Sequence, residues 1–265
     1  METSPHCLVR FLTVRNIRLV ARLDVKAPNL VKGIQLEGLR KLGNPSDFAI
    51  QYYDQGIDEI YYEDIVASLY ERNSLVDIIE TTSRDIFVPI TVGGGLRSID
   101  DVATVLRAGA DKVAINTAAI KDPSIISSVA RRFGSQCMVL SIQAKRQGDN
   151  WEAYFDNGRE HSGLDVIEWA KTGQKMGAGE ILLTSVDQEG TAHGFDISLI
   201  KSIVNMVDIP VIASGGMGAL NHIEHVIKHS HADAVAMASV LHYKKYTVDE
   251  LRNHCIRSGI PVRRI

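Results

Sequence analysis

Cysteine is scarce in this sequence. Three cysteines occur among the 265 residues, at Cys7, Cys137 and Cys255, and no two of them form a CxxC pair. Their odd number and wide spacing argue against a disulfide framework and against a cysteine-based zinc site. We therefore expect reduced thiols, as in a cytoplasmic protein, and the sequence indicates no metal or other cofactor.

Long apolar runs and an excess of one charge are also absent. No stretch approaches the ~18 consecutive apolar residues of a membrane span, and the first residues lack the apolar region and cleavage site of a secretory signal. The net charge of −3 offers no strongly basic face for nucleic acid. With 45% hydrophobic and 23% charged residues, the chain is not disordered. We expect a soluble cytoplasmic protein with no nucleic-acid or membrane partner.

Eight short apolar segments predict the strands of a parallel sheet. Helical patterns lie between most of them, as over 98–108 and 122–133, each closed by a glycine. The predicted strands are 19–25, 59–62, 88–92, 112–115, 138–142, 180–184, 211–213 and 234–238. Eight parallel strands with intervening helices close into a barrel, so the fold class is α/β and the expected fold a (β/α)8 TIM barrel. A doubly wound open sheet is the rival architecture.

The sequence also contains an internal repeat, with an offset close to half its length. Three pairs of corresponding residues lie 119 to 122 positions apart: Asp24 and Gln143, Gly95 and Gly216, and Thr117 and Ser239. This offset predicts a barrel of two similar half-barrels. We expect one domain over residues 14–265, preceded by an N-terminal extension over residues 1–13.

Two glycine-rich segments, 92–95 and 213–216, follow the third and seventh predicted strands. Glycine backbone N–H groups at the carboxyl end of barrel strands approach an anion closely, although such segments can also be simple tight turns. Two of them in the same half-barrel register favour two phosphate sites. The substrate would then be elongated, with a phosphate at each end.

Asp24 lies at the end of a predicted barrel strand, where catalytic groups lie. A structural aspartate in a salt bridge is the alternative.

Two other segments carry unusual residues. Four histidines within 222–231 fall on a predicted outer helix and favour a solvated polar face over a metal site. A turn signal at 156–158, after Trp151 and Tyr154, predicts a small β-excursion over the barrel mouth.

Several motifs resemble one family. They are LDVK at 23–26, LVKG at 30–33, TVGGG at 91–95, GADKVAINTAA at 109–119, FGSQ at 133–136, GAGEILLTS at 177–185, DQEGT at 187–191, IASGG at 212–216 and ASVLH at 238–242. In this order and spacing they resemble the cyclase subunits of imidazole glycerol phosphate synthase, the HisF family. The resemblance runs from about residue 18 to near the C-terminus.

The resemblance implies a barrel that forms a heterodimer with a glutaminase subunit. Ammonia would enter at the amino-terminal face and meet a bisphosphorylated ribosyl aminoimidazole at the mouth, in a step of histidine biosynthesis. The implied phosphate positions are Gly95, Asn116 and Thr117 on one side and Gly190, Gly216, Ala238 and Ser239 on the other. The implied ammonia gate is Arg18, Glu59, Lys112 and Glu180.

The catalytic positions depart from the family pattern. The family uses two aspartates, which correspond to Asp24 and to Gln143 in this sequence, and an amide cannot exchange a proton near neutral pH. A further family aspartate corresponds to Glu189, and Lys32 follows Asp24 as a candidate catalytic cation. Arg22 lies two residues before Asp24, on the same strand face, and would weaken Asp24 as an acid.

Three interpretations remain open at this point. The chain catalyses the family reaction with Asp24 doing more of the proton transfer and Glu189 assisting. Alternatively, it is a paralogue that uses the ammonia to amidate a sugar nucleotide for surface polysaccharide, from acetamido to acetamidino. The third interpretation is a non-catalytic barrel that activates the glutaminase.

Overall fold

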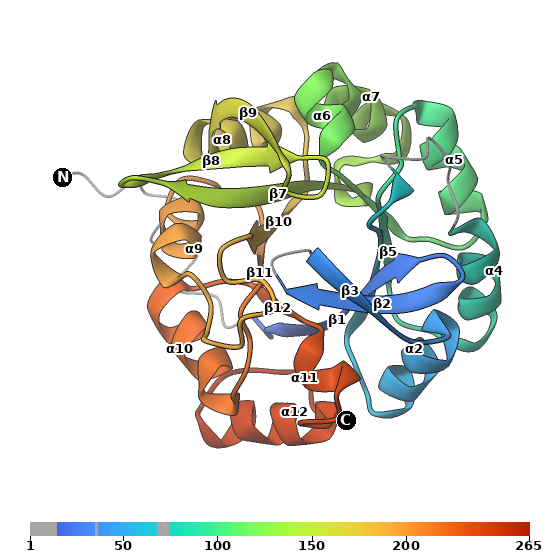
Figure 1. Cartoon of the computed structure of the whole chain (residues 1–265), viewed down its shortest axis with the longest axis vertical. Helices are drawn as coiled ribbons and strands as arrows, with labels where there is room; N and C mark the ends of the chain where they lie inside the picture. The colour runs from blue at the N-terminus through green and yellow to red at the C-terminus, as the bar shows by residue number, and fades with distance from the viewer. Residues whose placement is uncertain (1–14, 35–36, 68–74) are drawn as a thin grey trace.

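A closed ring of eight parallel strands forms the centre of the protein (Figure 1). The computed structural model describes residues 15–34, 37–67 and 75–265, so the expected extension over 1–13 lies outside the described residues. The ring runs β10-β11-β12-β1-β4-β5-β6-β7 and closes through pairing of β7 with β10. Its members are β1 (Arg18–Lys26), β4 (Glu59–Asp64), β5 (Ile90–Gly93), β6 (Lys112–Ile115), β7 (Met138–Gln147), β10 (Glu180–Ser185), β11 (Val211–Ser214) and β12 (Ala234–Met237). All eight predicted strands are present, which confirms the (β/α)8 barrel.

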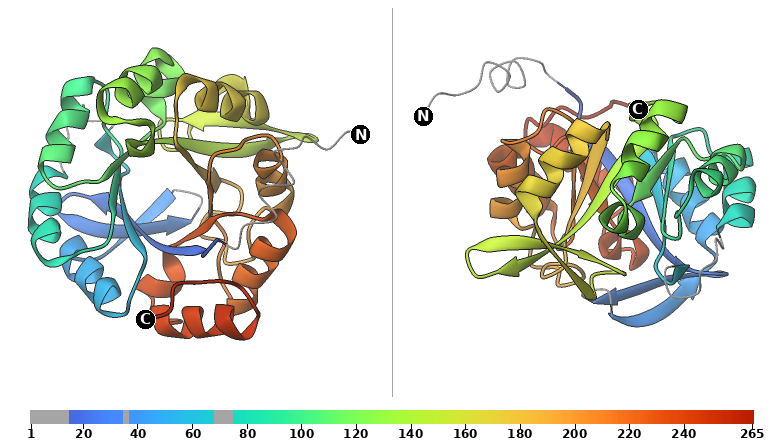
Figure 2. Two further views of the ribbon diagram at one scale, coloured as in Figure 1. Left: turned by 180° about the vertical axis from the view of Figure 1, so that it is seen from behind. Right: turned by 90° about the horizontal axis from the view of Figure 1, so that it is seen from above.

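Helices surround this ring on its outer side (Figures 1 and 2). They are α2 (Pro45–Asp54), α4 (Val76–Asp85), α5 (Ile99–Arg107), α6 (Thr117–Lys121), α7 (Ser124–Phe133), α8 (Val166–Met176), α9 (Ile197–Val204), α10 (Leu220–Ser230), α11 (Ser239–His242) and α12 (Val248–Arg257), with a 3₁₀ turn at Ser135–Cys137. Helix α5 begins after Ser98, close to the start of the predicted helical pattern over 98–108, and the Ser98 hydroxyl accepts the N–H of Asp101 in a reciprocal capping box.

The apolar core has two parts because each barrel strand is covered on both faces. A small cluster fills the inside of the barrel, and it comprises Val20, Tyr61, Ala114, Val139, Leu182, Ile212, Ala234 and Ala236. A much larger cluster lies between the strands and the helices. Burial of both faces explains why the strands read as nearly continuous apolar runs. Cys137 and Cys255 are buried free thiols, and Cys7 lies outside the described residues.

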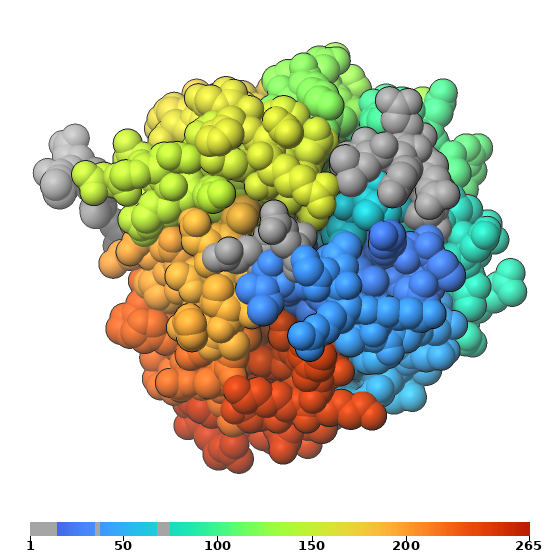
Figure 3. Space-filling model, in the orientation of Figure 1, coloured from blue at the N-terminus to red at the C-terminus, as the bar shows by residue number. Residues whose placement is uncertain are grey.

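Two antiparallel hairpins extend from the carboxyl ends of barrel strands. The first, β2 (Asn29–Ile34) and β3 (Glu37–Gly43), follows β1, and the second, β8 (Asn150–Phe155) and β9 (Glu160–Asp165), follows β7. Both lie at one end of the barrel and cover much of that face (Figures 2 and 3). The turn at 156–158 confirms the predicted β-excursion, with φ of 48° at Asp156 and 59° at Asn157. The first hairpin was not among the predicted strands.

Across the described ranges, no helix combines the length and the apolar character that a membrane crossing requires.

Candidate active site

A row of four buried charged side chains lies at the carboxyl end of β1. Arg22 Nε donates to Asp24 Oδ1 at 2.8 Å, and Lys32 Nζ lies 3.3 Å from Asp24 Oδ2. Lys32 also pairs with the carboxylate of Glu189. None of the four residues is more than 4% exposed. The structure thus brings together the predicted catalytic residues Asp24, Lys32 and Glu189, and it places Arg22 beside Asp24, as expected from their shared strand face.

The side chain of Arg22 crosses the inside of the barrel. Its Nη1 donates to Thr184 Oγ1 at 3.1 Å and to Ser214 Oγ at 3.2 Å. Those residues belong to β10 and β11, which β12 separates from β1 in the ring. The guanidinium also lies over the ring of Tyr61, 5.8 Å from its centroid. Because arginine stays protonated at any physiological pH, these contacts fix a permanent positive charge inside the barrel.

The two cations determine the ionisation of Asp24. Burial alone would raise the pKa of this carboxyl, but the charges of Arg22 and Lys32 outweigh burial and lower the pKa to about 2. Asp24 is therefore a carboxylate throughout the neutral range. It can stabilise a positive charge, but near neutral pH it is a poor proton acceptor and has no proton to donate. This agrees with the effect that the sequence predicts for Arg22.

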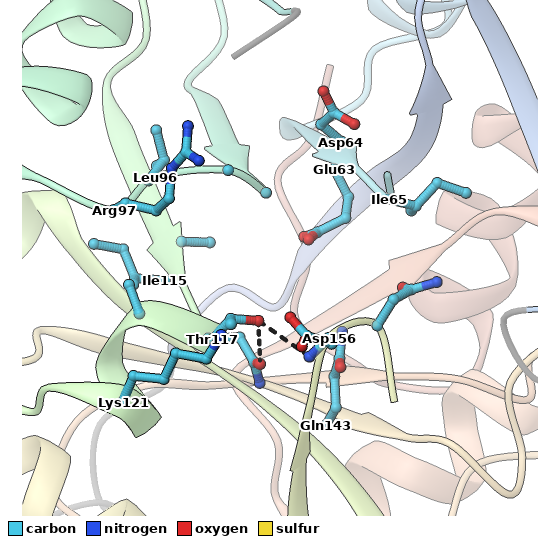
Figure 4. A pocket seen from close by; sticks show the side chains of 16 residues that line it. Glu63, Asp64, Ile65, Leu96, Arg97, Ile115, Thr117, Lys121, Gln143 and Asp156 are labelled. Atoms are coloured by element: carbon cyan, nitrogen blue, oxygen red, sulfur yellow. Dashed lines mark hydrogen bonds between the residues drawn. The ribbon is translucent and has the colours of Figure 1, made fainter. Parts of the chain in front are cut away.

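Gln143 occupies the corresponding place in the other half-barrel. It is 4% exposed, lies on β7 and lines a cavity at the barrel mouth (Figure 4). Within the described part of the chain, its Oε1 atom is buried and has no hydrogen-bond partner. A buried acceptor without a partner is costly unless a ligand supplies the donor. The amide therefore offers one acceptor to an N–H or O–H group, but no proton.

The cavity that Gln143 lines is called the first cavity. It contains one of the two sets of residues that were predicted to bind phosphate. It is lined by Gly95, Asn116 and Thr117, together with the cation Lys121. The Asn116 amide donates to main-chain carbonyls of β7 and β8, both at 3.1 Å. The Thr117 hydroxyl accepts the N–H of Asp156 at 3.1 Å, which ties the second hairpin to this cavity (Figure 4). The lining side chains are thus held in place before any ligand binds.

A second, smaller cavity contains the other predicted group. It is lined by Gly190, Gly216, Ala238 and Ser239, next to Arg22 and Glu189. Gly216 has φ of 101°, and a Cβ atom there would lie 1.9 Å from the carbonyl oxygen of Gly194. Glycine is therefore required at this position for two independent reasons.

The two cavities lie in opposite halves of the ring. The first opens among β4 to β7, and the second among β10, β11, β12 and β1. The seven predicted phosphate residues thus separate into the two groups that the half-barrel offset indicates. Asp24, Lys32 and Glu189 lie at the same mouth as both cavities.

The four predicted gate residues form a closed ring of alternating charge at the opposite end of the strands. Glu59 accepts Arg18 at 2.7 Å and Lys112 at 3.0 Å, while Glu180 accepts Lys112 at 2.9 Å and also pairs with Arg18. The hydroxyl of Thr91 donates to Glu59 at 2.6 Å. The carboxylate side chains are 1% and 7% exposed, so this charge ring closes the floor of the barrel.

One ionisable residue of the site, Glu63, was not predicted from the sequence. It lines the first cavity with Gln143, and burial raises its carboxyl pKa to about 8. The signal was present in the alternation of Glu59, Tyr61 and Glu63 along β4, which places all three on one face of the strand. Glu59 was already expected inside the barrel, so Glu63 could have been placed there too.

The histidine-rich helix exposes two of its histidines, as expected of a solvated polar face. On α10, His225 and His229 are exposed, while Ile223 and Val226 are buried. In the ranges that the structure describes, no group of three or more histidine, cysteine, aspartate or glutamate residues could hold a metal ion. This helix carries a polar outer face.

Comparison with known proteins identifies the family. Residues 18–247 match the family described as "Histidine biosynthesis protein". The chain is 64% identical over 206 residues to the imidazole glycerol phosphate synthase subunit HisF of Legionella pneumophila. The matched region covers 77% of this chain and 97% of that protein. The chain belongs to the HisF family. Two further proteins of that name, from Dehalococcoides mccartyi and Thermococcus onnurineus, are each 46% identical, over 94% and 93% of this chain and 98% and 97% of their own lengths.

Membership of the HisF family decides between the interpretations that the sequence left open. It supports a synthase of histidine biosynthesis over the sugar-nucleotide and non-catalytic alternatives. Gln143 and Arg22 are thus features of the candidate site in a HisF-family enzyme.

Proposed function

We propose that this chain is the ammonia-using cyclase subunit of an imidazole glycerol phosphate synthase. Its substrate would be a bisphosphorylated ribosyl aminoimidazole, and its partner a glutaminase subunit in a heterodimer. The observation that carries this proposal is the pair of glycine-lined cavities in opposite halves of one barrel mouth, with the buried Asp24 cluster at that same mouth. A substrate with a phosphate at each end matches two such cavities.

The two cavities support different parts of substrate binding. Lys121 and the backbone around Gly95 would hold one phosphate, while Ser239 and the backbone around Gly216 would hold the other. Fixing both ends places the middle of the substrate near Asp24 and Gln143. Holding the reactive carbon in this way accelerates addition of ammonia, because the substrate has already lost its translational freedom when it binds.

The charge ring at the floor supports entry of ammonia from the partner. Arg18, Glu59, Lys112 and Glu180 neutralise one another, and the ring faces the end of the barrel opposite the cavities. We propose that the glutaminase docks on this face and that ammonia passes through the ring towards Asp24.

Asp24 would stabilise the positive charge that develops on the nitrogen as ammonia adds. Its low pKa keeps it ionised for this task. Lys32 and Arg22 would position the carboxylate, and Glu189 would hold Lys32.

The test uses the purified chain with the imidazole precursor and an ammonium salt. We expect formation of the imidazole and ribotide products, and a loss of about 100-fold or more in Asp24→Asn, the magnitude typical of a positioned charged group in a transition state. Glu160→Gln, at an exposed position of β9, serves as a matched control. No turnover by the unmodified chain, with turnover of an acetamido sugar nucleotide instead, would overturn the proposal. Full activity of Asp24→Asn would overturn the role of Asp24.

A further inference from the structure

The catalytic centre lacks an obvious proton donor. Asp24 is held ionised, and Gln143 cannot release a proton near neutral pH. Addition of ammonia to a carbonyl carbon nevertheless needs a proton for the oxygen that receives the electron pair. Lys32 is a cation at the mouth, but the carboxylates of Glu189 and Asp24 outweigh burial and raise the pKa of its ammonium group, so it releases a proton poorly. Another group at the mouth is therefore the better source of the proton.

Glu63 lies where such a donor is needed. It pairs in register with Asp24 across the β1–β4 ladder, and it lines the first cavity together with Gln143. Figure 4 shows its carboxyl group directed into the cavity, on the side facing Gln143 and Thr117. The residue is 9% exposed, and in the described part of the chain its carboxyl group has no hydrogen-bonding or ion-pairing side chain. Its oxygen atoms are therefore available to a bound molecule.

The neighbouring strand leaves a space for this carboxyl group. Gly93 pairs in register with Glu63 on β5, and a Cβ atom at Gly93 would lie 2.6 Å from Glu63 Oε2 and 2.5 Å from the Tyr61 hydroxyl. Any larger residue at position 93 would displace both side chains. The absence of a side chain on Gly93 thus leaves room for the Glu63 carboxyl group at this place.

Glu63 and Asp24 carry opposite protonation states. Burial raises the pKa of Glu63 to about 8, Arg22 lowers it in part, and the charges of Asp24 and Asp64 raise it further. Arg22 donates hydrogen bonds to Asp24, Thr184 and Ser214 rather than to Glu63. At neutral pH one carboxyl group is therefore a neutral acid and its neighbour an anion, which is the pattern of an acid paired with a charge stabiliser.

Building on the proposed function, we propose that Glu63 is the proton-transfer residue of this enzyme and that Gln143 orients the attacking ammonia. The unpaired Gln143 Oε1 accepts one N–H of ammonia. As the N–C bond forms, the π electron pair of the C=O bond moves onto the oxygen, which takes the proton of Glu63 and becomes a hydroxyl. The nitrogen, now an ammonium group beside Asp24, returns a proton to the Glu63 carboxylate. The step ends with a neutral amino alcohol and with Glu63 protonated again.

The experiment compares the unmodified chain with Glu63→Gln, using the imidazole precursor at saturation and a constant concentration of un-ionised ammonia from pH 6 to 9.5. We expect kcat of the unmodified chain to fall as pH rises through about 8. Glu63→Gln should lose about 100-fold or more in kcat and should lack that alkaline limb. Its affinity for the precursor should change less than about threefold, because the phosphate-binding groups are untouched. Glu168→Gln, an exposed residue of α8 that pairs with Lys171, makes the same chemical change outside the site.

Three outcomes would overturn the inference while leaving the proposed function intact, and two of them concern turnover. One is turnover of the precursor by Glu63→Gln within threefold of the unmodified chain. The other is a kcat that stays flat up to pH 9.5, which needs no variant and so does not depend on whether Glu63→Gln folds. A third measurement does not depend on turnover. The ¹³C resonance of the Glu63 carboxyl group, assigned by its absence in Glu63→Gln, should report a protonated acid at pH 7, and an ionised Glu63 there would overturn the inference.

Discussion

Arg22 Nε and Asp24 Oδ1 lie 2.8 Å apart on one face of β1, with 3% and 2% of the two residues exposed. This contact separates the present site from a simple pair of catalytic carboxyl groups. It holds Asp24 as an anion, and it anchors a guanidinium that reaches the far wall of the barrel. Under the proposed function, the proton would therefore come from another group, and Glu63 is the neighbouring carboxyl group whose pKa is moved in the opposite direction.

Replacement of the arginine tests how strongly this contact controls the site. We expect Arg22→Met to raise the pKa of Asp24 and to lower the free energy of unfolding at pH 7 by about 3 kcal/mol, since it leaves a buried carboxylate with one cation fewer. The pKa of Asp24 is depressed in the folded state, so its stabilising contribution is present above the ordinary value of 3.8 and is lost as pH falls towards 2. The difference between the two proteins in urea unfolding should therefore shrink below pH 4.

Arg146→Met is the matched control for that experiment. Arg146 lies 3.5 Å from Asp196, but its side chain is 46% exposed, so its removal should cost less than about 1 kcal/mol. An equal loss of stability in the two variants would contradict the importance of the buried pair.

The neutral state of Glu63 predicts a pH dependence of stability. Because the folded state keeps this carboxyl group protonated up to about pH 8 while the unfolded chain releases the proton near its ordinary value of 4.5, rising pH destabilises the fold through Glu63. Glu63→Gln removes this effect. Relative to the unmodified chain, the variant should gain roughly 1.4 kcal/mol per pH unit inside that interval. Urea unfolding at pH 5, 6, 7 and 8 measures the gain, and parallel stability curves would contradict it.

The backbone at Gly216 predicts a strong steric effect. We expect Gly216→Ala to lower the free energy of unfolding by about 3 kcal/mol, through positive φ and a clash with the carbonyl oxygen of Gly194. Gly259 has φ of +72°, but a methyl group there would meet no atom within 4 Å, so Gly259→Ala should cost only about 1 kcal/mol. Thermal unfolding of both variants separates the clash from the backbone conformation. Equal shifts in Tm would show that crowding at Gly216 is unimportant.

The charge ring at the floor predicts a cost for losing one cation. Lys112→Met leaves the carboxylates of Glu59 and Glu180 with Arg18 as their remaining partner within the ring, and we expect a loss of about 3 kcal/mol in urea unfolding at pH 7. Lys171→Met, which removes a solvent-exposed pair with Glu168, should cost less than about 1 kcal/mol. A loss of similar size in both variants would mean that the ring contributes no more than a surface pair.

The barrel could be predicted from the sequence because its signals are local and repeated. Apolar segments such as 112–115 and 180–184 are buried on both faces and are bounded by helical patterns with caps at Ser98 and Gly134. The half-chain offset adds long-range information, since it relates Gly95 to Gly216 through the order of residues alone. These signals do not depend on which side chains meet across the barrel.

The parts of the structure that the sequence did not predict depend on contacts between side chains that are far apart in the sequence. The hairpin of β2 and β3 carries Lys32 and Gly33 in a segment with little apolar alternation, and its partner β1 supplies the pairing. Glu63 reads as one more acidic residue beside Asp64 until Gly93 is seen to leave room for it on the next strand. The contact of Arg22 with Thr184 and Ser214 joins residues 162 and 192 positions apart, a distance that no local pattern reports.

The crossing of the barrel by Arg22 also limits what can travel through it. The guanidinium lies between the floor ring and the mouth, in an interior where charges are poorly screened. This fixed positive charge would repel an ammonium ion entering from the floor, whereas it would not repel uncharged ammonia. If ammonia takes the proposed route, the interior would therefore favour its uncharged form, whose lone pair is free to attack.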